Sequence, residues 1–164
     1  MVGGAADTAP GPAVLFAHRL SRTEPTGIDR YAFELGAALS RLAEAQPLLM
    51  TSTHERAQPE DWPAGLSIRR VPGPRRLVHA SWSALHRPRL ETLLRLRPRV
   101  VHSLSPVVPV PTDAPLVVTV HDLTPVERPH HFAPRERWLF RRAVARATAW
   151  ATARRNSHRS RGAK

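Results

Sequence analysis

Short runs of consecutive apolar residues, separated by segments with helical spacing, are the feature that most limits the fold of this chain. Residues 13–17 (AVLFA) and 116–120 (LVVTV) are such runs. A short continuous apolar run is typical of a strand buried on both faces, as in a parallel sheet. Between these runs, Ile28, Tyr31 and Leu35 recur at the spacing of a helix face. The alternation predicts an α/β domain with a mostly parallel sheet covered by helices.

Proline and polar capping residues indicate where the elements begin and end. Pro88 is expected to break or kink the first turns of a helix, because proline lacks the backbone donor and clashes with the preceding turn. Pro134 suits the first turn of a final helix. Thr26 or Asp29 can cap the first helix. The further strands expected are residues 47–53, 66–71 and 99–104, and the further helices are residues 82–96 and 134–149.

Length and composition indicate one folded domain. A chain of 164 residues fits one domain and not two, and 41% apolar residues are too many for a disordered segment. The expected organisation is a flexible segment at residues 1–12, a Rossmann-like domain at residues 13–150 and a basic, disordered tail at residues 151–164.

The absence of cysteines and of long apolar runs indicates the compartment of the protein. No cysteine occurs, so disulfides and thiolate metal sites are excluded. No apolar run approaches the ~18 residues that a membrane helix needs. The cytoplasm is therefore the expected compartment, and a peripheral position on the inner face of the membrane stays open.

The positive charge of the chain is concentrated near its carboxyl end. The net charge is +12, and nine of the excess positive charges lie after Glu136, where no acid occurs. Because the rest of the chain is only mildly basic, nucleic acid is disfavoured as a partner. A basic protein that binds a polyanion or a membrane surface through its tail remains an alternative.

Two sequence motifs follow apolar runs directly and are candidates for a site. In an open parallel sheet, ligands bind outside the carboxyl ends of the strands. Gly27, within TGIDRY, opens a helix after the first strand and lets a backbone amide approach an anion. His121 and Asp122, within TVHDL, bring an imidazole and a carboxylate to the same edge of the sheet.

Other arrangements of reactive residues are disfavoured. Ser103 and Ser105 end a strand, but no G-x-S-x-G motif is present, so a serine hydrolase is not expected. His130 and His131, with His121 upstream, lack a carboxylate or cysteine at a familiar metal-ligand spacing. We therefore expect no metal site and no cofactor.

In this order, the motifs resemble the acceptor-side, amino-terminal domain of family 4 glycosyltransferases, enzymes with the two-domain GT-B fold. The resemblance spans about residues 13–147. It is most specific in TGIDRYAFELGAAL (residues 26–39), VVHSLSPVVPVP (100–111) and the stretch from PLVVTVHDL to the arginine-rich helix (115–147).

The resemblance implies a nucleotide-sugar donor, an acceptor substrate and transfer with retention of configuration. It implies that Gly27 and Ile28 lie in a loop whose backbone approaches the donor diphosphate or the acceptor. His121 would face the sugar across the cleft as the catalytic residue, Asp122 would support its loop, and Ser105 would line the acceptor side. Such enzymes act mainly by positioning their substrates and by stabilising the departing diphosphate.

The chain also departs from that family. The second domain, which supplies most of the nucleotide pocket, is missing, and residues 148–164 (TAWATARRNSHRSRGAK) replace the expected apolar strand. We therefore expect a truncated or frame-changed enzyme that is inactive alone, unless a separate chain supplies the second domain. A non-catalytic binding module of the same fold is the alternative.

Overall fold

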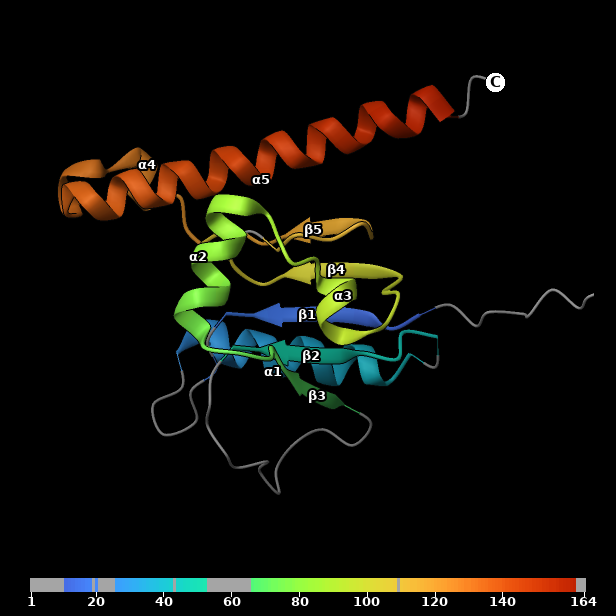
Figure 1. Ribbon diagram of the computed structural model, residues 1–164. Helices are drawn as coiled ribbons and strands as arrows, with labels where there is room; N and C mark the ends of the chain where they lie inside the picture. The colour runs from blue at the N-terminus through green and yellow to red at the C-terminus, as the bar shows by residue number, and fades with distance from the viewer. Residues whose placement is uncertain are drawn as a thin grey trace, which may run out of the picture.

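A five-stranded sheet in which neighbouring strands are parallel forms the centre of the molecule (Figure 1). The computed structural model describes residues 11–18, 20, 26–42, 44–52, 66–108 and 110–161, with side chains described as far as Ala149. The strand order is β3-β2-β1-β4-β5. The strands are β1 (Ala13–Ala17), β2 (Leu48–Thr51), β3 (Ser67–Arg70), β4 (Val100–Ser103) and β5 (Leu116–Val118).

Helices cover both faces of the sheet (Figure 1). Alternate residues of β1 explain why: Val14 and Phe16 pack in one hydrophobic cluster, whereas Leu15 and Ala17 pack in another. The first cluster contains Trp82 and other side chains from the helices on that face. Helix α1 (Gly27–Ser40) lies on one face, and α2 (Arg75–Leu85) and α3 (Leu90–Leu94) lie on the other. The remaining elements, in chain order, are α4 (Thr124–Glu127), the 3-10 turn η1 (Pro129–His131) and α5 (Pro134–Arg161).

The expected Rossmann-like α/β fold with a parallel sheet is confirmed, as are a strand at each predicted place and a final helix that begins at Pro134. The first residues of the expected flexible segment, 1–10, lie outside the described residues. The boundaries of the expected domain and tail stay predictions.

The single helix expected over residues 82–96 is wrong in its bounds. The structure has two helices there, and α2 already begins at Arg75. Pro88 lies between them, and its carbonyl accepts a hydrogen bond from the Trp82 indole Nε1 at 2.9 Å. Proline ends the regular helical hydrogen bonding at this point, as expected, but the break separates two helices and does not kink one.

The final helix is longer than expected. Helix α5 continues to Arg161, whereas the apolar periodicity indicated an end near Ala149. Arginine and alanine are strong helix formers, so backbone propensity can extend a helix beyond its apolar periodicity. In the part of the chain that the structure describes, no helix combines the length and the apolar character needed to cross a membrane.

Candidate functional site at the carboxyl edge of the sheet

The strand order changes direction at β1, which is the switch point of the sheet. From β1 the chain moves to β2 and β3 on one side, and it then returns to place β4 and β5 on the other side. At such a switch point, the loops that leave the carboxyl ends of neighbouring strands run apart and leave room for a ligand. Among the described residues, the elements beside this point are α1, which follows β1 in the chain, and the segment that follows β4 at Leu104.

His121 lies at this edge and is held there by two contacts. Its Nε2 is 2.8 Å from the Leu104 carbonyl oxygen, just after β4. Because a carbonyl only accepts, Nε2 must carry the proton, and the neutral ring then keeps Nδ1 as an acceptor. The Tyr31 ring on α1 meets the imidazole edge-on, with ring centroids 4.9 Å apart and an interplanar angle of 82°. His121 is therefore packed beside α1 yet remains exposed.

Gly27 opens α1 at the same edge. Thr26 is the N-cap, and it forms a capping box with Asp29, whose Oδ2 accepts hydrogen bonds from the Thr26 amide at 2.7 Å and hydroxyl at 2.8 Å. The expectation that Thr26 or Asp29 caps this helix is confirmed. A Cβ built on Gly27 would meet no atom of the described residues within 4 Å, so those residues leave the space beside its backbone open. Ile28, the next residue, is half-buried.

A family model described as Glycosyltransferase Family 4 matches residues 25–159, from the start of α1 into the last turns of α5. The chain belongs to glycosyltransferase family 4. Comparisons with curated proteins and with solved structures gave no significant match. In this family 4 domain, the matched region includes every candidate residue chosen from the sequence.

Asp122 supports the loop that follows His121. Its Oδ1 accepts hydrogen bonds from the Thr124 hydroxyl and from the Thr124 amide, the latter at 2.7 Å. These bonds from the side chain and backbone of Thr124 lower the pKa of Asp122, although the carboxylate is exposed. The carboxylate therefore fixes the start of α4 and is ionised near neutral pH.

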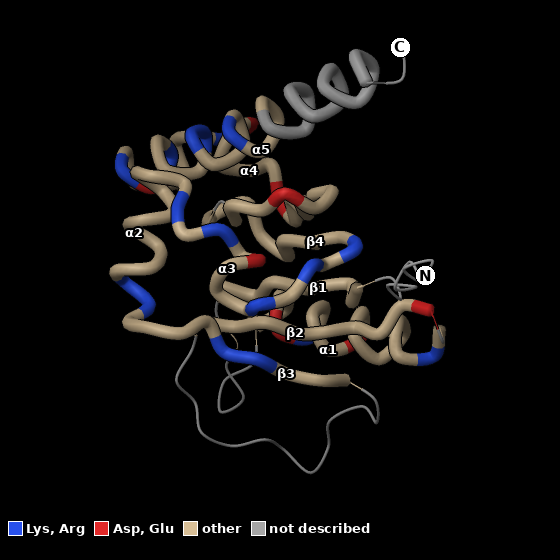
Figure 2. The backbone as a smooth tube through the Cα atoms, turned by 45° about the vertical axis from the view of Figure 1, so that its right-hand side comes forward, with Lys and Arg blue, Asp and Glu red and all other residues tan. Residues whose placement is uncertain are grey.

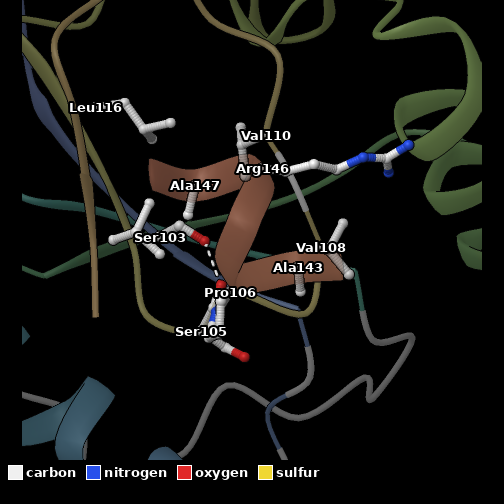
Figure 3. A pocket seen from close by; sticks show the side chains of 10 residues that line it. Ser103, Ser105, Pro106, Val108, Val110, Leu116, Ala143, Arg146 and Ala147 are labelled. Atoms are coloured by element: carbon white, nitrogen blue, oxygen red, sulfur yellow. Dashed lines mark hydrogen bonds between the residues drawn. The ribbon is translucent and has the colours of Figure 1, made fainter. Parts of the chain in front are cut away.

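Ser105 lies at the same edge, but its side chain is buried. Its hydroxyl accepts a hydrogen bond from the Val107 amide at 3.3 Å, and its carbonyl accepts one from the Ser103 hydroxyl at 2.8 Å. Both serines line a cavity of about 20 Å³ that α5 closes with Ala143 and Ala147 (Figure 3). Ser105 therefore shapes the turn after β4 from the inside, and it is not brought to the exposed surface that Gly27 and His121 share.

A second polar cluster at this edge was missed by the sequence reasoning. The buried Ser52 hydroxyl, just after β2, donates to the His18 carbonyl at 2.9 Å and lies 2.7 Å from Nε2 of His79 on α2. Since the hydroxyl has only one proton, His79 Nε2 must be the donor to Ser52. Burial, followed by the positive charges of His18 and Arg75, lowers the pKa of His79 from 6.5 to about 4.

His102 forms a third polar contact behind His121. Its Nε2 is 2.7 Å from the Thr119 hydroxyl. This contact links β4, which contains His102, to the residue that follows β5. Burial, with a smaller contribution from His121, lowers the pKa of His102. A neutral His102 adds no positive charge next to His121. The structure brings none of the described His, Asp and Glu side chains together in a group of three that could hold a metal ion.

His79 should make the folded state sensitive to acid. The unfolded chain takes up this proton near pH 6.5 and the folded chain only near pH 4, so stability is lost as the pH falls between these values. After solvent screening of a half-buried ring, we expect a loss of about 1–2 kcal/mol.

His79→Gln keeps a donor for Ser52 but does not titrate, so its unfolding free energy should fall less over this range. Urea unfolding across the range checks this, with His130→Gln on the exposed turn as control. Equal pH slopes for wild type and His79→Gln would count against the assignment.

Proposed function

We propose that this domain is the acceptor-side half of a retaining glycosyltransferase, which moves a sugar from a nucleotide sugar to an acceptor hydroxyl. The observation that carries the proposal is the meeting of His121 with the first turns of α1 at the switch point of the sheet. Family membership supports a glycosyltransferase-like function for this edge. The open space beside Gly27 supports the approach of a substrate to the backbone there.

His121 has a defined role in this proposal. Its Nε2–H donates a hydrogen bond to the Leu104 carbonyl, so the neutral ring offers Nδ1 as an acceptor for a sugar hydroxyl. One hydrogen bond of this kind fixes the orientation of the sugar ring relative to the acceptor. Asp122 acts indirectly by holding the loop through Thr124. Ile28 lies next to Gly27 at the start of α1, and the buried Ser105 acts only indirectly, by shaping the turn after β4.

The departing diphosphate requires groups that these residues do not provide. Leaving-group charge in such transfers is stabilised by positioned donors in a cleft that excludes water. In the described residues, the site is an open edge of one domain. We therefore propose that the second domain, on the same polypeptide or on a separate chain, closes over this edge and binds most of the nucleotide.

A comparison of the isolated and the completed protein tests this function. We expect no transfer above background by the 164-residue chain, and transfer after a family 4 carboxyl-terminal domain is joined to it. The measurement is sugar release and transfer from a panel of nucleotide sugars. Robust transfer by the isolated chain would show that the donor site lies within it. If neither protein binds a nucleotide sugar, the non-catalytic binding module is the better description.

A further inference from the structure

Helix α5 exposes a surface that its packing does not use. Its inward side carries Ala143 and Ala147, which pack toward the end of β4. Its outward side carries Trp138, which is 57% exposed, and Leu139, which is 49% exposed. About half of the surface of each of these large apolar residues therefore stays in contact with solvent.

Arginines surround these two apolar side chains. Arg135, Trp138, Leu139 and Arg142 follow the spacing of one helix face, and Arg141 lies beside them. An open groove of about 550 Å³ runs along this part of the helix. Trp138, Arg141 and Arg142 line it together with Arg137 and the two prolines Pro129 and Pro134. We call Arg135, Trp138, Leu139, Arg141 and Arg142 the α5 surface.

The charge of the α5 surface is not balanced by acidic side chains of the described residues. Figure 2 shows blue bands of Lys and Arg recurring along the described part of α5. Glu136 is the acid nearest in sequence, and its Oε2 accepts a hydrogen bond from the Ala133 amide at the start of the helix. Within the described part of the chain, none of the five residues forms an ion pair. The complementary partner is therefore anionic.

Trp138 and Leu139, the apolar residues of the α5 surface, favour a lipid surface over a nucleic acid as its partner. The Arg142 guanidinium lies over the Trp138 ring, 5.2 Å from its centroid, so one face of the indole is already covered and is not available for base stacking. Leu139 offers apolar area that a polynucleotide does not use but that the boundary between lipid headgroups and acyl chains does. Tryptophan with arginine on an exposed helix face suits that boundary.

We propose that the α5 surface docks this domain on a membrane that contains anionic phospholipid. Arg135, Arg141 and Arg142 contact the lipid phosphates, and Trp138 and Leu139 enter the interface between them. This site lies on the body of α5 and is distinct from residues 151–164. Each basic residue held near an anionic surface raises partitioning about fivefold at physiological ionic strength.

Vesicle sedimentation of the 164-residue chain tests the proposal. We expect binding to vesicles that contain phosphatidylglycerol and little binding to phosphatidylcholine alone. Arg141→Glu with Arg142→Glu changes the local charge by four units and should lower partitioning on the order of 10²-fold or more. Arg75→Glu with Arg76→Glu is the matched control, because it makes the same net change on exposed arginines of α2. This control should stay close to wild type.

Three further measurements separate the sources of binding. Trp138→Ser should weaken binding to the phosphatidylglycerol vesicles about tenfold or more, since one large apolar anchor is lost. A chain that ends at Ala149 should keep its preference for anionic vesicles, and circular dichroism checks that each variant is folded. The proposal is overturned if both double variants lose binding equally, or if removing the tail alone abolishes it. Tight binding to a single-stranded oligonucleotide without vesicle binding would overturn it in favour of nucleic acid.

Discussion

Replacing His121 by alanine should lower turnover of the completed two-domain enzyme by about 10²-fold or more, the scale expected when one positioned polar group near developing charge is lost. The expectation follows from the contacts that fix the ring: the hydrogen bond to Leu104 sets its tautomer, and Tyr31 sets its position. Transfer from the best nucleotide sugar of the panel is the measurement.

Two companion variants make the His121 result specific. His121→Gln can donate its amide to Leu104 and present its oxygen as an acceptor, so it should recover part of the lost turnover. His130→Ala removes an exposed imidazole from η1 and should leave turnover unchanged. An unchanged rate for His121→Ala would remove His121 from the site, and the fold assignment would still stand.

Replacing Trp82 by alanine should lower the free energy of unfolding by about 3–5 kcal/mol. Trp82 is fully buried, it meets Phe16 edge-on with ring centroids 5.4 Å apart, and its indole donates to the Pro88 carbonyl. The change therefore leaves a cavity between α2 and the sheet and an unpaired carbonyl. For a small domain, this loss is a large fraction of the total stability.

Urea unfolding followed by circular dichroism measures the effect of Trp82→Ala. Trp138→Ala is the matched control: it removes the same side chain from the exposed side of α5, and it should change stability by no more than about 0.5 kcal/mol. Trp82→Phe should fall between the two. Similar losses for Trp82→Ala and Trp138→Ala would contradict the placement of Trp82 in the core.

The central strands β1 and β2 were predictable from the sequence because they are buried on both faces. Residues 13–17 form β1 with the predicted bounds, since a continuous apolar run carries an unambiguous signal. Helix α2 was harder to locate. Only Val78 and Trp82 are buried in it, and it opens with two exposed arginines, so its first turns show no apolar periodicity. The end of α5 was missed for a related reason, because residues beyond Ala149 offer propensity but no apolar stripe.

The candidate site was predictable only in part. His121 and Gly27 could be selected because each directly follows a predicted strand or opens a predicted helix. His79 could not be selected from the sequence, since it lies within α2 and its hydrogen-bond partner Ser52 belongs to a distant part of the sequence. Sequence spacing also could not show that Ser105 is buried beneath α5, because burial there depends on how that helix crosses the end of β4.

The strand order also governs how this protein can reach its folded state. β1 pairs with β2, but Val14 also pairs with Val101 of β4, which lies far along the chain. Closing so long a loop costs entropy before any contact is gained, so pairings of this kind are slow to form. The local unit of β1, α1 and β2 contains the cap of α1 but neither Leu104 nor His121. The contact of His121 with Leu104 therefore forms only after the most non-local pairing of the sheet, and the chain acquires its candidate site late in folding.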